Sequence, residues 1–104
     1  MCGIIGYASK SYDSCGIVIS CLKNLEYRGY DSSGIATNES GKIEMYKAQG
    51  KILNLEQKLD EKEILASTAI AHTRWATHGK PCETNAHPHR VGNVTLVHNG
   101  IIEN

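Results

Sequence analysis

The start of the sequence, Met1-Cys2-Gly3, carries two groups that could work together as a nucleophile and a base. Once Met1 is removed, Cys2 holds a thiol and a free α-amino group on the same residue. The ordinary pKa values of these groups are about 8.5 and about 8, so both can change charge near neutral pH. The amine can therefore take the thiol proton, directly or through a water, without a catalytic histidine. The alternative interpretation is that residue 2 is simply a small residue.

A second stretch, from Ala71 to Gly79, contains Arg74 and Trp75 side by side at the end of a predicted strand. The planar guanidinium of an arginine can form two charge-assisted hydrogen bonds to a carboxylate, so Arg74 is a candidate ligand-binding residue. Trp75 is large, rigid and half polar, which suits a side chain that closes over a ligand. A surface salt bridge for Arg74 and a core position for Trp75 are the alternatives.

A third stretch begins at His98 and contains the pair Asn99-Gly100. Asn-Gly is the commonest dipeptide in tight hairpin turns, which favours a turn. An Asn side-chain amide and the following Gly amide can also aim two donors at one developing oxyanion. Ile101-Ile102 follows with little room for a second strand, which weakens the turn interpretation.

The histidines and Cys82 raise the question of a metal site. His87-Pro88-His89 has the wrong spacing for two ligands on one helix face, and the sequence contains no Cys-x-x-Cys or His-Glu-x-x-His pattern. We therefore expect these histidines to form hydrogen bonds in loops, and we expect neither a metal nor a cofactor.

The composition is that of a small, neutral chain. Its 104 residues fit one domain, and 11 Lys and Arg balance 11 Asp and Glu. This balance argues against a nucleic-acid binder, and no apolar run is long enough to cross a membrane. The start lacks the basic flank and apolar region of a signal peptide, so we expect a cytoplasmic protein. In a reducing cytosol, Cys15 and Cys21 are expected to be ordinary buried thiols.

Apolar periodicity and turn residues predict strands and helices in an α+β plan. The first strand is expected to be buried on both faces at the centre of a sheet, which would hold the amino terminus still. The expected strands are Cys2–Ala8, Gly34–Asn38, Lys42–Ala48, Ala69–Trp75 and Val94–Ile102, and the expected helices run from Asp13 or Ser14 to Gly29 and across Ile52, Leu55 and Leu59.

Local patterns refine this plan. The first helix is expected to present one apolar face, formed by Ile17, Val18, Cys21, Leu22 and Leu25. The stretch 38–41 is a hairpin signal, and the strand that follows it should have one solvent-exposed face. The stretch 76–93 is expected to be irregular.

Five motifs, in order along the whole chain, resemble the glutaminase domain of glucosamine-6-phosphate synthase, a class II glutamine amidotransferase. Related amidotransferases share the leading cysteine and an Asn-Gly pair, but they do not usually combine Glu-Tyr-Arg-Gly-Tyr-Asp with Thr-Arg-Trp-Ala-Thr-His. The motifs are Cys2–Gly6, Leu25–Gly34, His72–Gly79, Asn85–His89 and His98–Asn104.

This resemblance implies a fold and a reaction. The fold is that of the amino-terminal-nucleophile hydrolases, a four-layer αββα sandwich. The reaction is hydrolysis of the side-chain amide of glutamine, in which Cys2 attacks the amide carbon with its own amine as base. The resemblance further implies that Asn99 and the Gly100 amide form the oxyanion hole.

The resemblance also implies how glutamine is bound and where its ammonia goes. Arg74 would hold the α-carboxylate of glutamine, and Thr77 and His78 would line the same pocket. Trp75 would gate the passage of ammonia to a synthase half, which converts fructose 6-phosphate to glucosamine 6-phosphate. Such proteins are expected to be homo-oligomers at full length.

The chain is shorter than this family leads one to expect. Residues 1–104 would form only a partial glutamine amidotransferase domain, without its later strands and without the sugar-isomerase domains. We therefore expect either a fragment of a longer product or a remnant that acts as a non-catalytic interaction or regulatory module. A thiol redox protein is disfavoured because no Cys-x-x-Cys is present.

Overall fold

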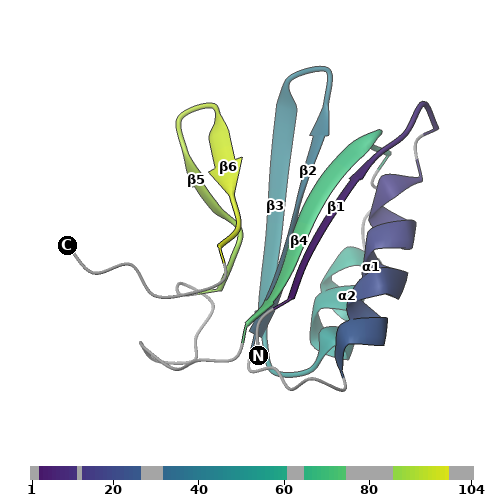
Figure 1. Cartoon of the computed structure of the whole chain (residues 1–104), viewed down its shortest axis with the longest axis vertical. Helices are drawn as coiled ribbons and strands as arrows, with labels where there is room; N and C mark the ends of the chain where they lie inside the picture. Colours follow the sequence, from purple (N-terminus) through teal and green to yellow (C-terminus); the bar gives the residue numbers. More distant parts are fainter. Residues whose placement is uncertain (1–2, 12, 27–31, 61–64, 75–85, 99–104) are drawn as a thin grey trace.

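The computed structural model describes residues 3–11, 13–26, 32–60, 65–74 and 86–98, which form helices and strands in an α+β arrangement (Figure 1). This confirms the predicted class. The elements are β1 (Gly3–Ala8), α1 (Ser14–Leu25), β2 (Ser32–Glu39), β3 (Lys42–Gln49), α2 (Ile52–Asp60), β4 (Thr68–Arg74), β5 (His89–Val91) and β6 (Val94–Leu96).

Four strands form an antiparallel sheet in the order β1-β4-β2-β3. The prediction that the first strand is central is wrong for this sheet, because β1 pairs with β4 alone among the described strands and lies at the edge. The prediction that it is buried on both faces is also wrong, since Ile4 is 45% exposed. An apolar run such as Ile4-Ile5 does not reveal which strands will pair. Here β4 lies between β1 and β2, although β1 and β2 follow one another in the sequence.

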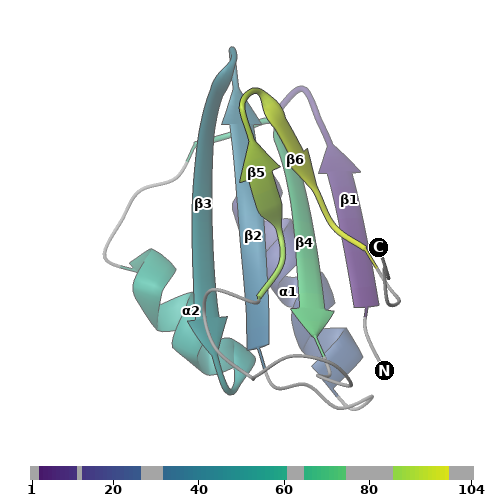
Figure 2. The ribbon, with the colours of Figure 1, turned by 90° about the vertical axis from the view of Figure 1, so that its left-hand side faces the viewer.

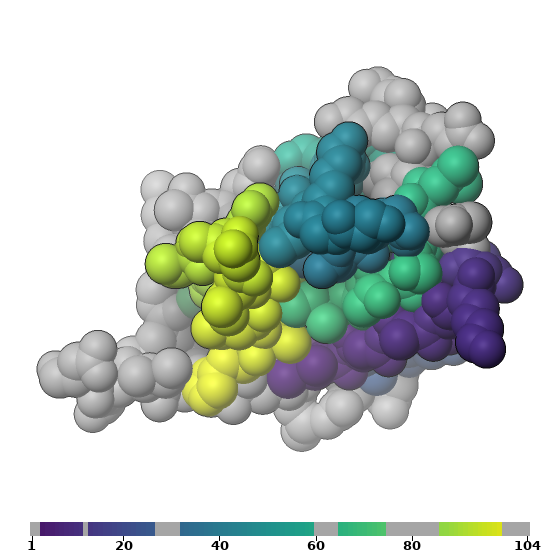
Figure 3. All heavy atoms as spheres, turned by 90° about the horizontal axis from the view of Figure 1, so that it is seen from above, coloured from purple at the N-terminus to yellow at the C-terminus, as the bar shows by residue number. Residues whose placement is uncertain are grey.

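The two faces of the sheet are covered differently (Figures 1 and 2). Helices α1 and α2 lie on one face, and the β5–β6 hairpin lies across the other. In Figure 3 the yellow-green atoms of this hairpin lie against the atoms of the sheet strands. Residues Ser32–Thr37 of β2 are all buried, because this strand has neighbours on both sides and is covered on both faces.

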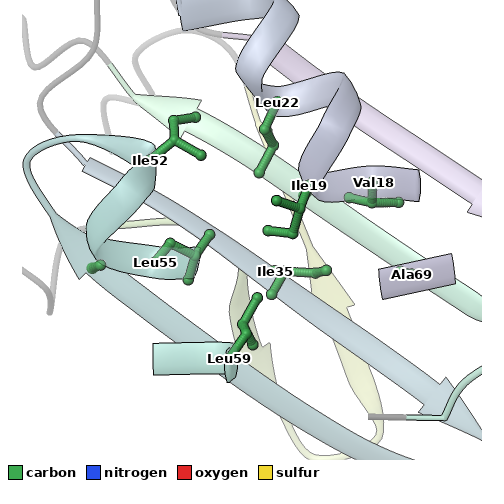
Figure 4. Close-up of a cluster of buried hydrophobic side chains, with 10 residues drawn as sticks. Val18, Ile19, Leu22, Ile35, Ile52, Leu55, Leu59 and Ala69 are labelled. Atoms are coloured by element: carbon green, nitrogen blue, oxygen red, sulfur yellow. The ribbon is translucent and has the colours of Figure 1, made fainter. Parts of the chain in front are cut away.

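The hydrophobic core lies between the two helices and the sheet (Figure 4). The predicted helix across Ile52, Leu55 and Leu59 is confirmed as α2, and all three side chains are buried. On α1 the predicted face is wrong at one position, because Ile19 is buried while Ile17 is 36% exposed. Helix α1 packs against the sheet and also against α2, so the stripe that it buries differs from the one that periodicity alone defines.

Helix α1 begins without the predicted side-chain cap. Asp13 occupies the N-cap position, but its side chain forms no capping hydrogen bond. Instead the Ser14 hydroxyl donates a 2.6 Å hydrogen bond to the carbonyl oxygen of Ala66. The start of α1 is therefore tied to the segment that leads into β4. Cys15 and Cys21 on this helix are free thiols and are half-buried rather than buried as expected.

The predicted hairpin between β2 and β3 is confirmed. Ser40 and Gly41 form its two-residue turn with φ values of 53° and 88°, and the Gly41 amide donates a 3.0 Å hydrogen bond to the Asn38 side chain. Positive φ at both turn residues matches the right-handed twist of the strands. The predicted solvent-exposed face of β3 is wrong, because residues 43–47 are all half-buried. Arg90 on β5 reaches the Ile43 carbonyl oxygen at 3.4 Å, so the hairpin lies along that face.

The strands in the last part of the chain differ from the predicted ones in position and length. Strand β5 lies within the stretch expected to be irregular. Strand β6 ends at Leu96, although the prediction extended it to Ile102. Three-residue strands are too short for a periodic pattern to reveal them. The predicted helix stop at Gly29 and residues 99–102 of the predicted strand lie outside the described residues.

Candidate active site

Arg74 is the predicted site residue that lies within the described part of the chain. It is the last residue of β4 and is half-buried. The other predicted site residues lie outside the described residues, and they are Cys2, Trp75, Thr77, His78, Asn99 and Gly100. Three described residues lie next to predicted site residues in the sequence: Gly3 follows Cys2, Arg74 precedes Trp75, and His98 precedes Asn99. The geometry of these three neighbours defines the candidate site.

Three strand ends meet at one end of the four-stranded sheet. Strands β1 and β2 begin there and β4 ends there, because β4 runs antiparallel to both. Gly3 lies opposite Thr73, and Ser32 lies opposite Arg74. Neighbouring strands lie about 4.8 Å apart, so Gly3 and Arg74 lie close together at this end of the sheet.

His98 joins this region through its backbone. The imidazole of His72 donates from Nε2 to the His98 carbonyl oxygen at 3.0 Å. His72 is completely buried on β4, two residues before Arg74, and Ile4 of β1 lies opposite it. The side chain of His72 therefore connects the backbone just before Asn99 to the strand pair that begins just after Cys2.

A second histidine holds His98 from the other side. The His98 amide N–H donates to Nδ1 of His87 at 3.3 Å. The rings of His72 and His87 are stacked, with centroids 4.3 Å apart and planes at 25°. His89 continues the group with a centroid 4.4 Å from that of His87. Three imidazoles therefore pack in a row between β4 and the hairpin.

Gly34 makes this packing possible. A Cβ atom at position 34 would lie 2.0 Å from the carbonyl oxygen of His87, which is backbone and cannot rotate away. Position 34 faces the hairpin from the buried strand β2, opposite His72. Only glycine therefore lets the backbone at His87 approach the sheet closely enough for the two rings to stack.

The electrostatic environment keeps His87 uncharged. Burial, followed by the nearby charges of His72, His89, Arg74 and Lys47, lowers the pKa of His87 to about 4. Burial and the charges of Lys47 and Arg74 also lower the pKa of His89. A neutral His87 can accept the His98 N–H at Nδ1, whereas a protonated His87 cannot.

This shift predicts how stability depends on pH. Unfolded histidine has a pKa of about 6.5, and His87 in the fold has a pKa of about 4, so between these values the unfolded chain binds more protons. The stability that neutral His87 contributes should therefore be fully present above about pH 6.5 and should be lost as the pH decreases towards 4. We expect the thermal midpoint to drop less between pH 7 and pH 5 in His87→Asn than in the wild type. Equal drops in calorimetry would contradict this assignment.

Buried hydroxyl groups line the same end of the sheet. Ser32, Ser33 and Thr73 are completely buried, and their hydroxyls form no hydrogen bond to any described residue. Ser33 lies opposite Thr73, and Thr73 Oγ1 lies 3.1 Å from the place where Gly3 would carry a Cβ. Buried polar groups normally have partners, so this end of the sheet can accept a further polar group from a ligand or from the chain.

The pairing of His87 with His98 was missed from the sequence, although a signal for it was present. In the β5–β6 hairpin His89 lies opposite Leu96 and Val91 opposite Val94. Gly92-Asn93 forms the two-residue turn, and a Gly-Asn pair between apolar residues is a hairpin signal. Counting outward in this register places residue 87 opposite residue 98.

Among the described residues, no group of three or more His, Cys, Asp or Glu side chains is arranged to hold a metal ion. No helix in that part of the chain is long and apolar enough to span a membrane.

Sequence comparison relates the whole chain to one group of enzymes. No protein-family model matches the chain. Over the whole of this chain, the glutamine–fructose-6-phosphate aminotransferases (isomerising) of Caulobacter vibrioides, Helicobacter pylori and Clostridium acetobutylicum are 58%, 55% and 51% identical. The chain spans 17% of the length of each of these relatives.

A solved structure shows the same fold. The glutamine phosphoribosylpyrophosphate amidotransferase of B. subtilis, in complex with ADP and GMP, superposes with a TM-score of 0.68. The match covers 82% of this chain and 18% of that protein, at 26% sequence identity. The helical layer, the four-stranded sheet and the hairpin are thus those of an amino-terminal-nucleophile amidotransferase, which confirms the predicted fold. Over its whole length the chain is thus similar to part of the glutamine–fructose-6-phosphate aminotransferases, and it has the fold of a glutamine amidotransferase.

Proposed function

We propose that this chain is the glutaminase segment of a glutamine–fructose-6-phosphate aminotransferase, in which Cys2 hydrolyses the side-chain amide of glutamine. The observation that carries the proposal is the meeting of Gly3, Arg74 and His98 around His72 at one end of the sheet. These residues adjoin the predicted nucleophile, the predicted gate and the predicted oxyanion-hole donors. The whole-length similarity to such enzymes supports the same assignment.

In the first half of the reaction, the Cys2 thiol loses its proton to the α-amino group of the same residue. The sulfur then adds to the amide carbon of glutamine, and the carbonyl oxygen becomes an oxyanion. The Asn99 side-chain amide and the Gly100 N–H donate hydrogen bonds to this oxyanion. The amine returns its proton to the leaving nitrogen, so ammonia departs and a γ-glutamyl thioester remains.

In the second half, a water molecule replaces ammonia. The α-amine takes a proton from the water as it attacks the thioester carbon, and the same two donors stabilise the second oxyanion. Collapse breaks the carbon–sulfur bond, releases glutamate and restores the thiol. One residue therefore serves as nucleophile and base in both halves.

Arg74 is proposed to bind the α-carboxylate of glutamine. Arg74 is the last residue of β4, and Thr73 just before it lies opposite Gly3. The planar guanidinium group suits a bidentate contact with a carboxylate. Thr77 and His78 are proposed to line the same pocket, and Trp75 to gate the passage of ammonia.

The remaining assignments concern the whole protein. Residues 1–104 are proposed to form part of a single glutamine amidotransferase type-2 domain in a cytoplasmic protein. Fructose 6-phosphate, the acceptor of ammonia in the proposed reaction, would bind outside these residues. A homo-oligomer is proposed for the full-length protein.

A glutaminase assay tests the proposed function. Incubation with glutamine should release glutamate and ammonia in equal amounts, and asparagine should be a poor substrate because its amide lies one methylene closer to the α-carboxylate. The assay should be run on the 104-residue chain and on the full-length protein. A folded full-length protein that releases no glutamate would contradict the proposal and favour a non-catalytic interaction module.

A further inference from the structure

We propose that His72 and His87 are positioning residues that hold the backbone of His98 from both sides and thereby place the Asn99-Gly100 donors. This inference deepens the proposed function and rests on it for the catalytic part. The contacts themselves are properties of the fold, and they can be tested without any assay of activity.

Both polar groups of the His98 backbone are held by imidazoles. The His98 carbonyl oxygen accepts from His72 Nε2 at 3.0 Å, and the His98 N–H donates to His87 Nδ1 at 3.3 Å. A carbonyl oxygen can only accept, so His72 must carry its proton on Nε2. An amide N–H can only donate, so His87 must keep Nδ1 free of a proton. The two histidines therefore act in opposite hydrogen-bonding roles.

The His98 carbonyl belongs to the peptide unit that joins His98 to Asn99. Fixing this peptide limits the rotations that set the direction of the next residue, because the peptide is planar. Oxyanion-hole donors act through pre-organised geometry, and a displacement of about 1 Å can cost about 10²-fold in rate. A clasp at His98 is therefore well placed to hold the two donors in their working position.

The clasp is itself rigid. His72 is completely buried, and its ring stacks on that of His87 at 4.3 Å. The absence of a side chain at Gly34 lets the His87 backbone contact β2 directly. The hairpin register pairs His89 with Leu96, two residues from His87 and His98 respectively. Packing against β4 and β2 thus restricts both imidazoles that contact the His98 backbone.

The groups that face His87 favour its acceptor role. Burial is the largest cause that lowers the pKa of His87, followed by the charges of His72 on β4, His89 on β5, Arg74 on β4 and Lys47 on β3. Both effects disfavour a proton on His87. The acceptor at Nδ1 is therefore maintained through the neutral pH range.

Two matched pairs of substitutions test the clasp. An Asn side chain places an acceptor near the position of Nδ1, so His87→Asn keeps the acceptor. His87→Phe removes the acceptor but keeps an aromatic ring for packing. A Gln side chain places a donor near the position of Nε2, so His72→Gln keeps the donor and His72→Phe removes it. Thermal melts of all four variants show which of them fold.

The first readout is hydrogen exchange at the His98 amide, followed by NMR. We expect protection in the wild type and in His87→Asn, and an exchange rate about 10-fold or more higher in folded His87→Phe, because an amide that loses its acceptor opens more readily. Equal protection in His87→Phe and the wild type would overturn the clasp, whether or not the protein has activity.

The second readout is glutamine hydrolysis by the full-length protein. Both Phe variants should lower kcat about 10- to 100-fold with little change in KM, and the Asn and Gln variants should recover most of the loss. Lost protection of the His98 amide with an unchanged kcat would overturn the positioning role. Glutamine hydrolysis that persists in Cys2→Ala would instead remove the proposed function and leave the clasp intact.

Discussion

Cys2→Ala is expected to reduce glutamine hydrolysis by about 10⁴- to 10⁶-fold, the range seen when other hydrolases lose a member of their nucleophilic machinery. The substitution removes the sulfur that bonds to the amide carbon and leaves no group to form the thioester. A thermal melt of the variant shows whether the fold is retained. Release of glutamate, measured by a coupled assay, gives the result.

Cys21→Ala is the matched control for this prediction. Cys21 is a free, half-buried thiol on α1, which lies on the face of the sheet opposite the β5–β6 hairpin. We expect its replacement to leave kcat and KM within a factor of two, as for a small change away from a site. Retained turnover in Cys2→Ala would show that another group is the nucleophile.

The same prediction has a second form that tests the base. A protein that retains Met1 keeps the Cys2 thiol but replaces the α-amine by an amide nitrogen, which cannot accept a proton at neutral pH. We expect activity to disappear in such a protein, with retention verified by intact mass. Equal turnover with Met1 retained would show that the α-amine is not the base.

Asn99→Ala is expected to lower kcat by about 10²- to 10³-fold, the cost of removing one donor from an oxyanion hole. KM should change little, because the donor acts on charge that develops in the transition state rather than on bound glutamine. Steady-state kinetics with glutamine measures both constants.

Asn24→Ala provides the control for this substitution. Asn24 is exposed on α1, and alanine is the better helix former, so the change should not harm the fold. We expect unchanged kcat and KM. A kcat for Asn99→Ala equal to that of Asn24→Ala would remove Asn99 from the oxyanion hole and favour the turn interpretation of Asn99-Gly100.

Much of the secondary structure could be predicted because it depends on local patterns. The spacing of Ile52, Leu55 and Leu59 defined α2, and the turn residues at 38–41 defined the β2–β3 hairpin. The edge position of β1 could not be predicted, because it depends on β4 inserting beside a strand that is distant in sequence. The face of α1 was partly wrong for the same reason, since α1 packs against the sheet and also against α2.

The positions of several motif residues in the sheet were predictable in outline. Motif residues were expected at strand ends, and Gly3, Ser32 and Arg74 do lie at one end of the sheet. The histidine clasp could not be inferred from residue types alone, because it requires both the face on which His72 lies and the hairpin register that carries His87 to His98. Motifs report which residues are present, whereas such contacts depend on how distant segments are brought together.

The pairing of Gly3 with Thr73 has a consequence for synthesis of the chain. The edge strand cannot join its sheet until the partner strand, about seventy positions later, has been made. At about 5–20 residues per second this takes roughly 4–14 s. During that delay the backbone of β1 has no partner in this sheet, so the strand remains accessible to other proteins while the chain is being made.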